Sequence, residues 1–273
     1  MSVARAGGVQ LHYEVTGSGE PLVLVHGSWG DHHNWDPVVA ELARSFRVLA
    51  YDRRGHSASE RPAGQGSVFE DADDLAALID ELGLAPAHVV GNSFGAIVTL
   101  RAATRRPDVF RTLVAHEPPL FPLMAGTEFH PALEEVQRRL APIVELLAAG
   151  DHEAAARLFT DTIAFGPGAW EGRLSPEMRE VFIANAPTFL DEARDPDALQ
   201  MDLPALASFD RPALLTNGTH SAPFFGPIVD MVAAALPRSQ RVTIEGADHV
   251  PHISVPARYI EVVKTFAEAN AES

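Results

Sequence analysis

The sequence predicts an α/β fold in which a mainly parallel, twisted sheet is flanked by helices on both faces. Short β-type runs alternate with helical stretches over the first 120 residues, and the alternation returns after residue 212. Such alternation favours parallel strands joined by helices. The run Leu22–Val25 is apolar without interruption, which is typical of a strand that is buried on both faces.

Each strand is predicted from a short run with β-type composition. In chain order the predicted strands are Val9–Val15, Leu22–Val25, Arg47–Tyr51, His88–Gly91, Thr112–Ala115, Ala213–Thr216 and Arg241–Ile244. Helical spacing predicts helices over Val38–Arg44, Ala72–Leu82, Ala96–Thr104 and Pro227–Ala235, and from Ala257 onward. The clearest is Ala72–Leu82, because its apolar residues recur with helical spacing and Gly83 follows as a stop signal.

The composition changes between Leu120 and Leu203. This stretch is rich in Ala, Leu, Glu and Arg, has helical periodicity, and is broken by Pro and Gly. It lies between predicted strands, so it is best interpreted as an insertion. We therefore expect a core formed by residues 1–120 and 205–273 and a helical cap, or lid, over residues 121–204.

Composition excludes several classes of function. The 273-residue chain has 37 acidic and 21 basic residues, a net charge of −16, which repels phosphate backbones and anionic lipid. It has no cysteine, so disulfides, thiolate metal sites and a cysteine nucleophile are excluded. No apolar run is long enough to span a membrane and no apolar leader begins the chain. We expect a cytoplasmic monomer or homodimer that binds neither nucleic acid nor membrane.

A Gly-x-Ser-x-Gly pattern surrounds Ser93. It reads Gly91-Asn92-Ser93-Phe94-Gly95 and lies where a predicted strand passes directly into a helix. A sharp strand-to-helix turn exposes the serine, and glycines on both sides relieve the crowding that such a turn creates. In this context the pattern predicts a nucleophilic serine. The alternative is an ordinary strand–helix turn.

The predicted base is His249. Of twelve histidines, it lies on the loop between the last strand and the last helix, from which it can reach over the carboxyl ends of the strands toward Ser93. His252 is the alternate, although it is better explained by packing. The two histidines have the spacing of a metal pair but lack a third ligand, and a His-Glu-x-x-His pattern beginning at His152 fails because residue 156 is Ala. No metal site is predicted.

Four segments resemble the α/β-hydrolase superfamily and together span nearly the whole chain. They are HGSWG at 26–30, YDRRGHS at 51–57, GNSFG at 91–95 and GADH at 246–249. The resemblance is specific for the superfamily and unspecific for substrate. It implies that the backbone N–H groups of Ser28 and Phe94 form the oxyanion hole, with Gly27 shaping the first turn.

The acid of the triad is displaced from its usual place in this family. The family takes it from the loop after its seventh strand, which corresponds to Ala213–Thr216 here. This chain has Ser221 on that loop, and no Asp or Glu occurs between Asp210 and Asp230. Glu117 lies just after the predicted strand Thr112–Ala115, which corresponds to the family's sixth, and before two prolines. It is the other carboxylate that can reach the same imidazole. This arrangement resembles zearalenone-lactonase-like hydrolases. The alternative for Glu117 is a helix-capping or salt-bridged surface glutamate.

The predicted function is a cofactor-free serine hydrolase that cleaves a carboxylic ester or lactone of a hydrophobic small molecule through an acyl-enzyme on Ser93. The predicted cap supplies many apolar side chains, most of which we expect to pack between helices. The predicted substrate pocket is lined by Trp29, Leu123, Met124, Trp170, His220 and Ser221. Two alternatives remain. The first is a carbon–carbon bond hydrolase of diketone-type substrates, because the GNSFG turn of this chain also resembles the serine turn of that subgroup. The second is a non-catalytic ligand-binding module on the same scaffold.

Overall fold

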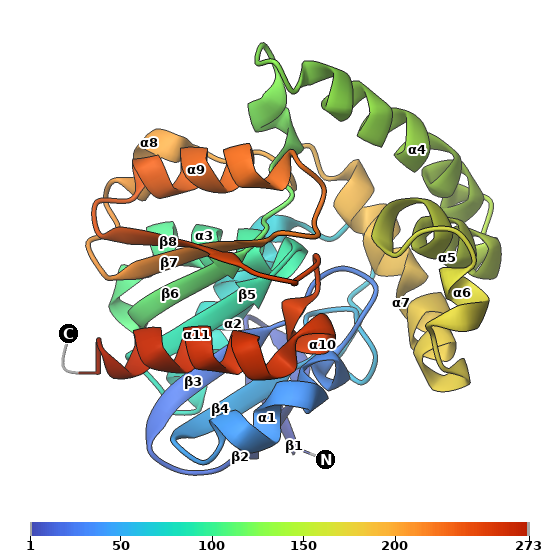
Figure 1. Cartoon of the computed structure of the whole chain (residues 1–273). Coiled ribbons are helices and arrows are strands. Elements are labelled where there is room, and N and C mark those ends of the chain that lie inside the picture. Colours follow the sequence, from blue (N-terminus) through green and yellow to red (C-terminus); the bar gives the residue numbers. More distant parts are fainter. Residues whose placement is uncertain (1, 272–273) are drawn as a thin grey trace.

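One eight-stranded sheet organises the computed structural model, which describes residues 2–271 (Figure 1). Its strand order is β1-β2-β4-β3-β5-β6-β7-β8. The pairs β1–β2 and β2–β4 are antiparallel and the others are parallel. The strands are β1 (Ser2–Ala6), β2 (Val9–Thr16), β3 (Glu20–Val25), β4 (Phe46–Tyr51), β5 (Ala87–Asn92), β6 (Phe110–His116), β7 (Ala213–Gly218) and β8 (Ser239–Ile244). The predicted α/β fold with a mainly parallel sheet is confirmed.

Helices cover both faces of this sheet (Figure 1). One face packs against α1 (Asp36–Leu42) and α11 (Pro256–Glu268), and the short helix α10 (Pro251–Ser254) contacts both of these helices. The opposite face packs against α2 (Val68–Glu81), α3 (Phe94–Arg105), α8 (Leu203–Leu206) and α9 (Phe225–Ala235). Two short 3₁₀ turns, η1 (His32–Trp35) and η2 (Pro107–Val109), lie in the connections.

Strand β3 shows why the sheet has two cores. Val23 and Val25 face one hydrophobic cluster, and Leu22 and Leu24 face the other, because successive side chains of a strand point to opposite faces. All four side chains are fully buried. The uninterrupted apolar run is therefore explained by a strand that has helices on both sides.

Strand β1 was missed by the sequence analysis. Residues Ser2–Ala6 pair antiparallel with β2 at the edge of the sheet, with Ala4 opposite Leu11. In this segment only Ala4 and Ala6 are buried, whereas Ser2, Val3 and Arg5 are exposed. Without a bulky β-branched residue at the buried positions, its strand pattern is weak.

The chain between β6 and β7 is helical, and Figure 1 shows its longer helices beyond one end of the sheet. It contains η3 (Phe121–Met124), α4 (His130–Ala148), α5 (His152–Phe159), η4 (Thr160–Ala164, a π-helical turn), α6 (Ala169–Gly172), α7 (Pro176–Arg194) and α8. Helices α4 to α7 share a hydrophobic cluster of their own, in which Trp29 takes part. Within residues 2–271, no helix combines the length and hydropathy needed to cross a bilayer.

Candidate active site

Ser93 lies between the end of β5 and the first residue of α3. Its backbone has φ +56° and ψ −124°, a conformation that side-chain-bearing residues rarely adopt. A Cβ on Gly95 would clash with the carbonyl oxygens of Val25 and His26, and a Cβ on Gly91 would clash with Gly95. The two glycines therefore allow the turn to pass close to β3 while it holds the serine at the carboxyl edge of the sheet.

His249 reaches Ser93 from the loop between β8 and α10. Its Nε2 lies 2.9 Å from Ser93 Oγ. The Asn92 side-chain amide donates to the His249 carbonyl oxygen at 2.8 Å, and the Phe225 ring stacks on the imidazole with 4.7 Å between centroids. Backbone and ring are thus both held in place. The alternate histidine, His252, is instead buried against Trp35, with 4.2 Å between the ring centroids.

Glu117 follows the last residue of β6 and is fully buried. Its Oε2 lies 2.7 Å from His249 Nδ1, and its Oε1 accepts a hydrogen bond from the Gly218 backbone N–H at 2.8 Å. Because an ionised carboxylate can only accept, Nδ1 carries the proton and Nε2 is free to accept one from Ser93. The structure therefore brings together the three residues that the sequence analysis assigned to a triad.

The pKa of Glu117 is subject to opposing effects of burial and of two neighbouring histidines, His249 and His116. Burial by itself raises the pKa of the carboxyl, but the hydrogen bond from His249 and the proximity of His116 outweigh it, and the pKa lies below its usual value. His116 is itself buried, which lowers its pKa to about 4. Near neutral pH, Glu117 is therefore a carboxylate beside a neutral His116.

The loop after β3 lies beside the serine. A Cβ on Gly27 would be 3.1 Å from the Ser93 Cβ, so a larger residue at 27 would crowd the nucleophile. Both Ser28 and Phe94 border the same cavity as Ser93. Within residues 2–271, neither of their backbone N–H groups donates a hydrogen bond to another backbone or side-chain group. They are thus available to an incoming oxygen atom.

A buried ion pair beneath this loop was missed by the sequence analysis. Arg53 donates to Glu192 at 2.6 Å and to the Gly27 carbonyl oxygen at 3.3 Å, and Ser28 Oγ donates to Glu192 at 2.5 Å. The guanidinium also lies 4.8 Å from the centroid of the Phe94 ring. Arg53 belongs to the YDRRGHS motif and could have been noticed, whereas no sequence signal marks Glu192 within its helix.

A cavity of about 410 Å³ opens above Ser93 between the sheet and helices α4, α5 and α7. Ser93, His249, Gly27, Ser28 and Phe94 border it. Most other residues around it are apolar or aromatic, including Phe121, Val136, Leu140, Phe159, Phe165, Met178, Phe182, Phe189, Phe224 and Phe225.

Of the six residues predicted to form the pocket, only Ser221 lines this cavity. Trp29 instead stacks against Phe159 and Phe189, and Trp170 is buried in the same cluster. Leu123 and Met124 pack onto the core beside the sheet, and His220 is exposed at the surface. These five side chains do not border the cavity, because packing between the helices decides which side chains reach it.

Comparison with known proteins identifies the class. Residues 22–262 match the model of the alpha/beta hydrolase family, and the chain belongs to that family. A solved alpha/beta hydrolase from Sphaerobacter thermophilus DSM 20745 is similar over 97% of this chain and 99% of its own, with 26% identity and a TM-score of 0.77.

Two curated relatives illustrate the range of similarity. The 2-(acetamidomethylene)succinate hydrolase of Mesorhizobium japonicum is 27% identical over 96% of this chain and 93% of its own length. The 2-hydroxymuconate semialdehyde hydrolase of Pseudomonas sp. strain CF600 is 35% identical over 50% of this chain and 51% of its own. Other relatives with higher identity align over less than half of their own length.

Proposed function

We propose that this protein is a serine hydrolase that cleaves a carboxylic ester or lactone of a hydrophobic small molecule. The observation that carries the proposal is the pair of hydrogen bonds that joins Ser93 Oγ to His249 Nε2 at 2.9 Å and His249 Nδ1 to Glu117 at 2.7 Å. This is the geometry of a nucleophile, a base and an orienting acid. Membership of the alpha/beta hydrolase family supports the same reaction class.

In the proposed first step, Ser93 Oγ attacks the substrate carbonyl carbon and its proton passes to His249 Nε2. The carbonyl oxygen becomes an oxyanion, which accepts hydrogen bonds from the N–H groups of Ser28 and Phe94. Collapse of the tetrahedral intermediate breaks the bond to the leaving oxygen, and His249 returns the proton to it. The products are an acyl-enzyme on Ser93 and an alcohol, which stays tethered to the acyl group if the substrate is a lactone.

In the second step, a water molecule attacks the acyl-enzyme. His249 accepts one proton from the water and donates it to Ser93 Oγ as the carboxylic acid leaves. Throughout both steps Glu117 holds the tautomer of His249 and stabilises the imidazolium that forms. The reaction therefore needs only groups of this chain and water.

The cavity supports a hydrophobic substrate of modest size. Its volume of about 410 Å³ lies within the usual range for small-molecule sites, and apolar lining with few polar groups is typical of them. A polar sugar or a phosphate ester would lose its hydration against these phenylalanine rings. An apolar acyl or lactone ring would gain from burial there.

A second candidate is hydrolysis of a carbon–carbon bond in a diketone-type substrate. It is favoured by the partial similarity to the 2-hydroxymuconate semialdehyde hydrolase of Pseudomonas. The displaced acid argues against it, because the resemblance to that subgroup implies an aspartate on the loop after β7, where this chain has Ser221.

Labelling with a fluorophosphonate probe tests the enzymatic proposal. The probe forms a covalent bond to a serine only when a base activates its hydroxyl. We expect one adduct, located at Ser93 by mass spectrometry, and no adduct in the Ser93→Ala variant. A folded wild-type protein that takes no label at Ser93 would instead support a non-catalytic binding module.

A substrate panel then separates the two candidate reactions. It contains p-nitrophenyl esters of graded chain length, small and macrocyclic lactones, and a vinylogous diketone. Turnover of the esters or lactones but not of the diketone is the expected result. A preference for the diketone would replace the ester proposal with the second candidate while leaving Ser93 as the nucleophile.

A further inference from the structure

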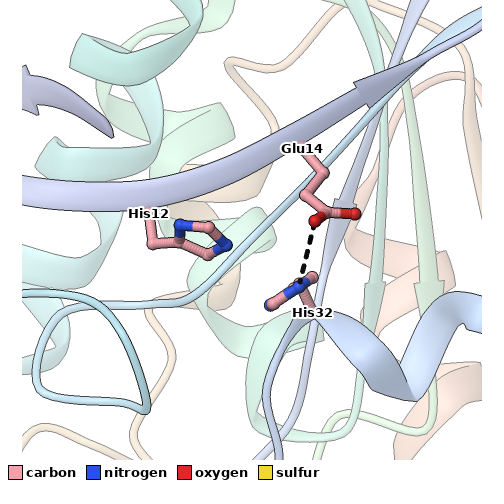
Figure 2. A group of neighbouring side chains, drawn as sticks. All are labelled: His12, Glu14 and His32. Atoms are coloured by element: carbon pink, nitrogen blue, oxygen red, sulfur yellow. Dashed lines mark ion pairs between the residues drawn. The ribbon is translucent and has the colours of Figure 1, made fainter. Parts of the chain in front are cut away.

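A second cluster of chemically active side chains lies at β2 and η1, outside the set of residues that border the cavity. It consists of His12, Glu14 and His32 (Figure 2), whose potential ligand atoms lie within 4.8 Å of one another. His12 and Glu14 are two residues apart on β2, so they share one face of the strand. His32 is the first residue of η1. Figure 2 shows the His12 ring and the Glu14 carboxylate directed toward His32.

Both histidines are buried and carry nitrogen atoms without a hydrogen-bond partner. His12 is 3% exposed and His32 is 6% exposed. Within residues 2–271, His12 Nδ1 and His32 Nε2 are buried and have no such partner. An unpaired buried polar atom is costly, and it demands a bound group or another explanation. His32 Nε2 faces the Glu14 carboxylate at 3.9 Å, which is too far for a hydrogen bond.

The other nitrogen of His32 is held by a carboxylate. His32 Nδ1 lies 2.6 Å from Asp52 Oδ1, and Asp52 is fully buried. The hydrogen bond places the proton on Nδ1 and leaves the lone pair of Nε2 directed toward Glu14. A carboxylate that orients a histidine in this way is the usual outer partner of a metal-binding imidazole.

A neighbouring group of three, Asp31, His32 and Asp52, is a weaker candidate. Asp52 already accepts from His32 and from the Ala58 N–H, and Asp31 accepts from Ser57 and the His33 N–H. The carboxylate oxygens of Asp31 and Asp52 are therefore already engaged in hydrogen bonds. The atoms of His12, Glu14 and His32 that face one another are not engaged, and this difference favours that group over Asp31, His32 and Asp52.

We propose that His12, Glu14 and His32 bind a divalent transition-metal ion, with zinc as the best match, at a site separate from the proposed catalytic residues. Two imidazoles and one carboxylate, with a fourth position open to water, are a ligand set that zinc accepts. Tetrahedral zinc places its ligand atoms about 3.3 Å apart. The Glu14 side chain is 57% exposed, which leaves it room to move toward the two imidazoles.

The position suggests what the ion does. It joins β2 to η1, which directly follows the loop that carries Gly27 and Ser28. A metal that binds the folded protein better than the unfolded chain raises the temperature of unfolding. The ion thus stabilises the folded connection between β2 and η1, at the C-terminal end of this loop, and takes no part in the proposed hydrolysis.

Zinc titration of the metal-free full-length chain tests the proposal. Isothermal titration calorimetry should give one tight equivalent, and cobalt substituted for zinc should give the visible absorption of a tetrahedral ion. We expect Glu14→Gln, at an exposed residue of the proposed site, to weaken zinc binding by at least about tenfold. The matched control is Glu261→Gln, on the exposed side of α11, which should bind zinc as wild type does.

Thermal unfolding in chelator and in zinc completes the test. The unfolding temperature of the wild type should rise with zinc, whereas Glu14→Gln should unfold like wild type in chelator and respond little to zinc. A wild-type chain that binds no zinc overturns the proposal. Equal zinc affinity in wild type and Glu14→Gln overturns it as well, because the ion then binds at other histidines.

Discussion

Ser93 and Glu117 both hold backbone conformations with positive φ, at +56° and +46°. Such conformations are uncommon for residues other than glycine and persist only where the surroundings enforce them. For Ser93 the enforcement comes from the glycine-flanked turn. For Glu117 it comes from β7, since the Glu117 N–H donates to the Thr216 carbonyl oxygen and the carboxylate accepts from the Gly218 N–H. Among the described residues, Trp29 and Ser57 are the other non-glycine residues with positive φ, so two of these four strained positions belong to the triad that we assign.

The close approach at Gly95 leads to a prediction for Gly95→Ala. The new methyl group would meet the carbonyl oxygens of Val25 and His26, which belong to the central strand β3 and its loop and cannot easily move. We expect the free energy of unfolding to fall by about 1–3 kcal/mol, as is typical of overpacking. Urea unfolding followed by circular dichroism measures it.

A second glycine-to-alanine variant is the control. Gly172 ends α6 and a Cβ there meets nothing within 4 Å. Gly172→Ala should change stability little, or raise it slightly by restricting the unfolded chain. Equal stability of the two variants would show that the serine turn does not depend on contact with β3.

Several site residues could be predicted from the sequence because they follow local rules. The turn at Ser93 and the loop at Gly27 are marked by glycines next to apolar strands, and His249 is marked by its place after the last strand. Glu117 was selected because no carboxylate occupies the loop after β7. Phe225, which stacks on His249, could not be found in this way, since its position depends on how α9 packs against the sheet.

At the scale of elements, helix α7 is tied to the loop after β3 at two points. Asn185 donates from its side-chain amide to the carbonyl oxygens of Trp29 and Gly30 at 3.2 and 3.0 Å. Two turns later, Glu192 accepts from Ser28 Oγ and pairs with Arg53. The Arg53 guanidinium also donates to the carbonyl oxygen of Gly27, whose peptide unit contains the Ser28 N–H. The orientation of that N–H therefore depends on a helix that lies far away in sequence.

This dependence leads to a prediction for Glu192→Gln. The substitution leaves Arg53 with Asp71 as its only buried carboxylate partner among residues 2–271 and weakens the contact to Ser28. We expect a loss of stability of about 3 kcal/mol, because the buried Arg53 charge then keeps only one of its two carboxylate partners. We also expect kcat on the best substrate of the panel to fall, because the Ser28 N–H loses its fixed orientation.

The control for Glu192→Gln is Glu180→Gln, on the same helix but exposed. It should leave both stability and kcat close to wild type. If Glu192→Gln lowers stability while kcat stays at the wild-type value, α7 supports the fold without positioning the Ser28 N–H for catalysis.

The strands of the parallel sheet were predictable, but the edge strand and the ends of the helices were not. The central strands carry continuous apolar runs because both of their faces are buried. Strand β1 has one buried face filled by alanines, so its pattern is faint. Helix α2 begins at Val68, four residues before the prediction, because Ser67 caps it by accepting from the Phe69 N–H.

At the scale of the whole molecule, the sheet and the helices between β6 and β7 contribute different parts of the candidate site. The sheet brings the carboxyl ends of β5, β6 and β7 side by side, and these ends hold Ser93, Glu117 and the Gly218 N–H. Helices α4, α5 and α7 supply most of the apolar lining. Because the chemistry and the lining come from different segments, the sequence motifs predict the reaction class far better than the substrate.

Although the chain is acidic, few of its carboxylates can serve the proposed triad. The chain has 37 acidic residues, yet the loop after β7 has none, and the one buried carboxylate that reaches His249 comes from β6 among the residues that the structure describes. The central claim is therefore that Glu117 acts as the acid of the triad.

The most direct test is the kcat of Glu117→Gln on the best substrate of the panel, with Ser93→Ala and the exposed variant Glu261→Gln beside it. We predict a fall of about 10³- to 10⁴-fold, a partial recovery in Glu117→Asp, no turnover in Ser93→Ala and wild-type turnover in Glu261→Gln. Circular dichroism confirms that each variant is folded. Near-full turnover in Glu117→Gln, with Ser93→Ala inactive, would contradict the claim.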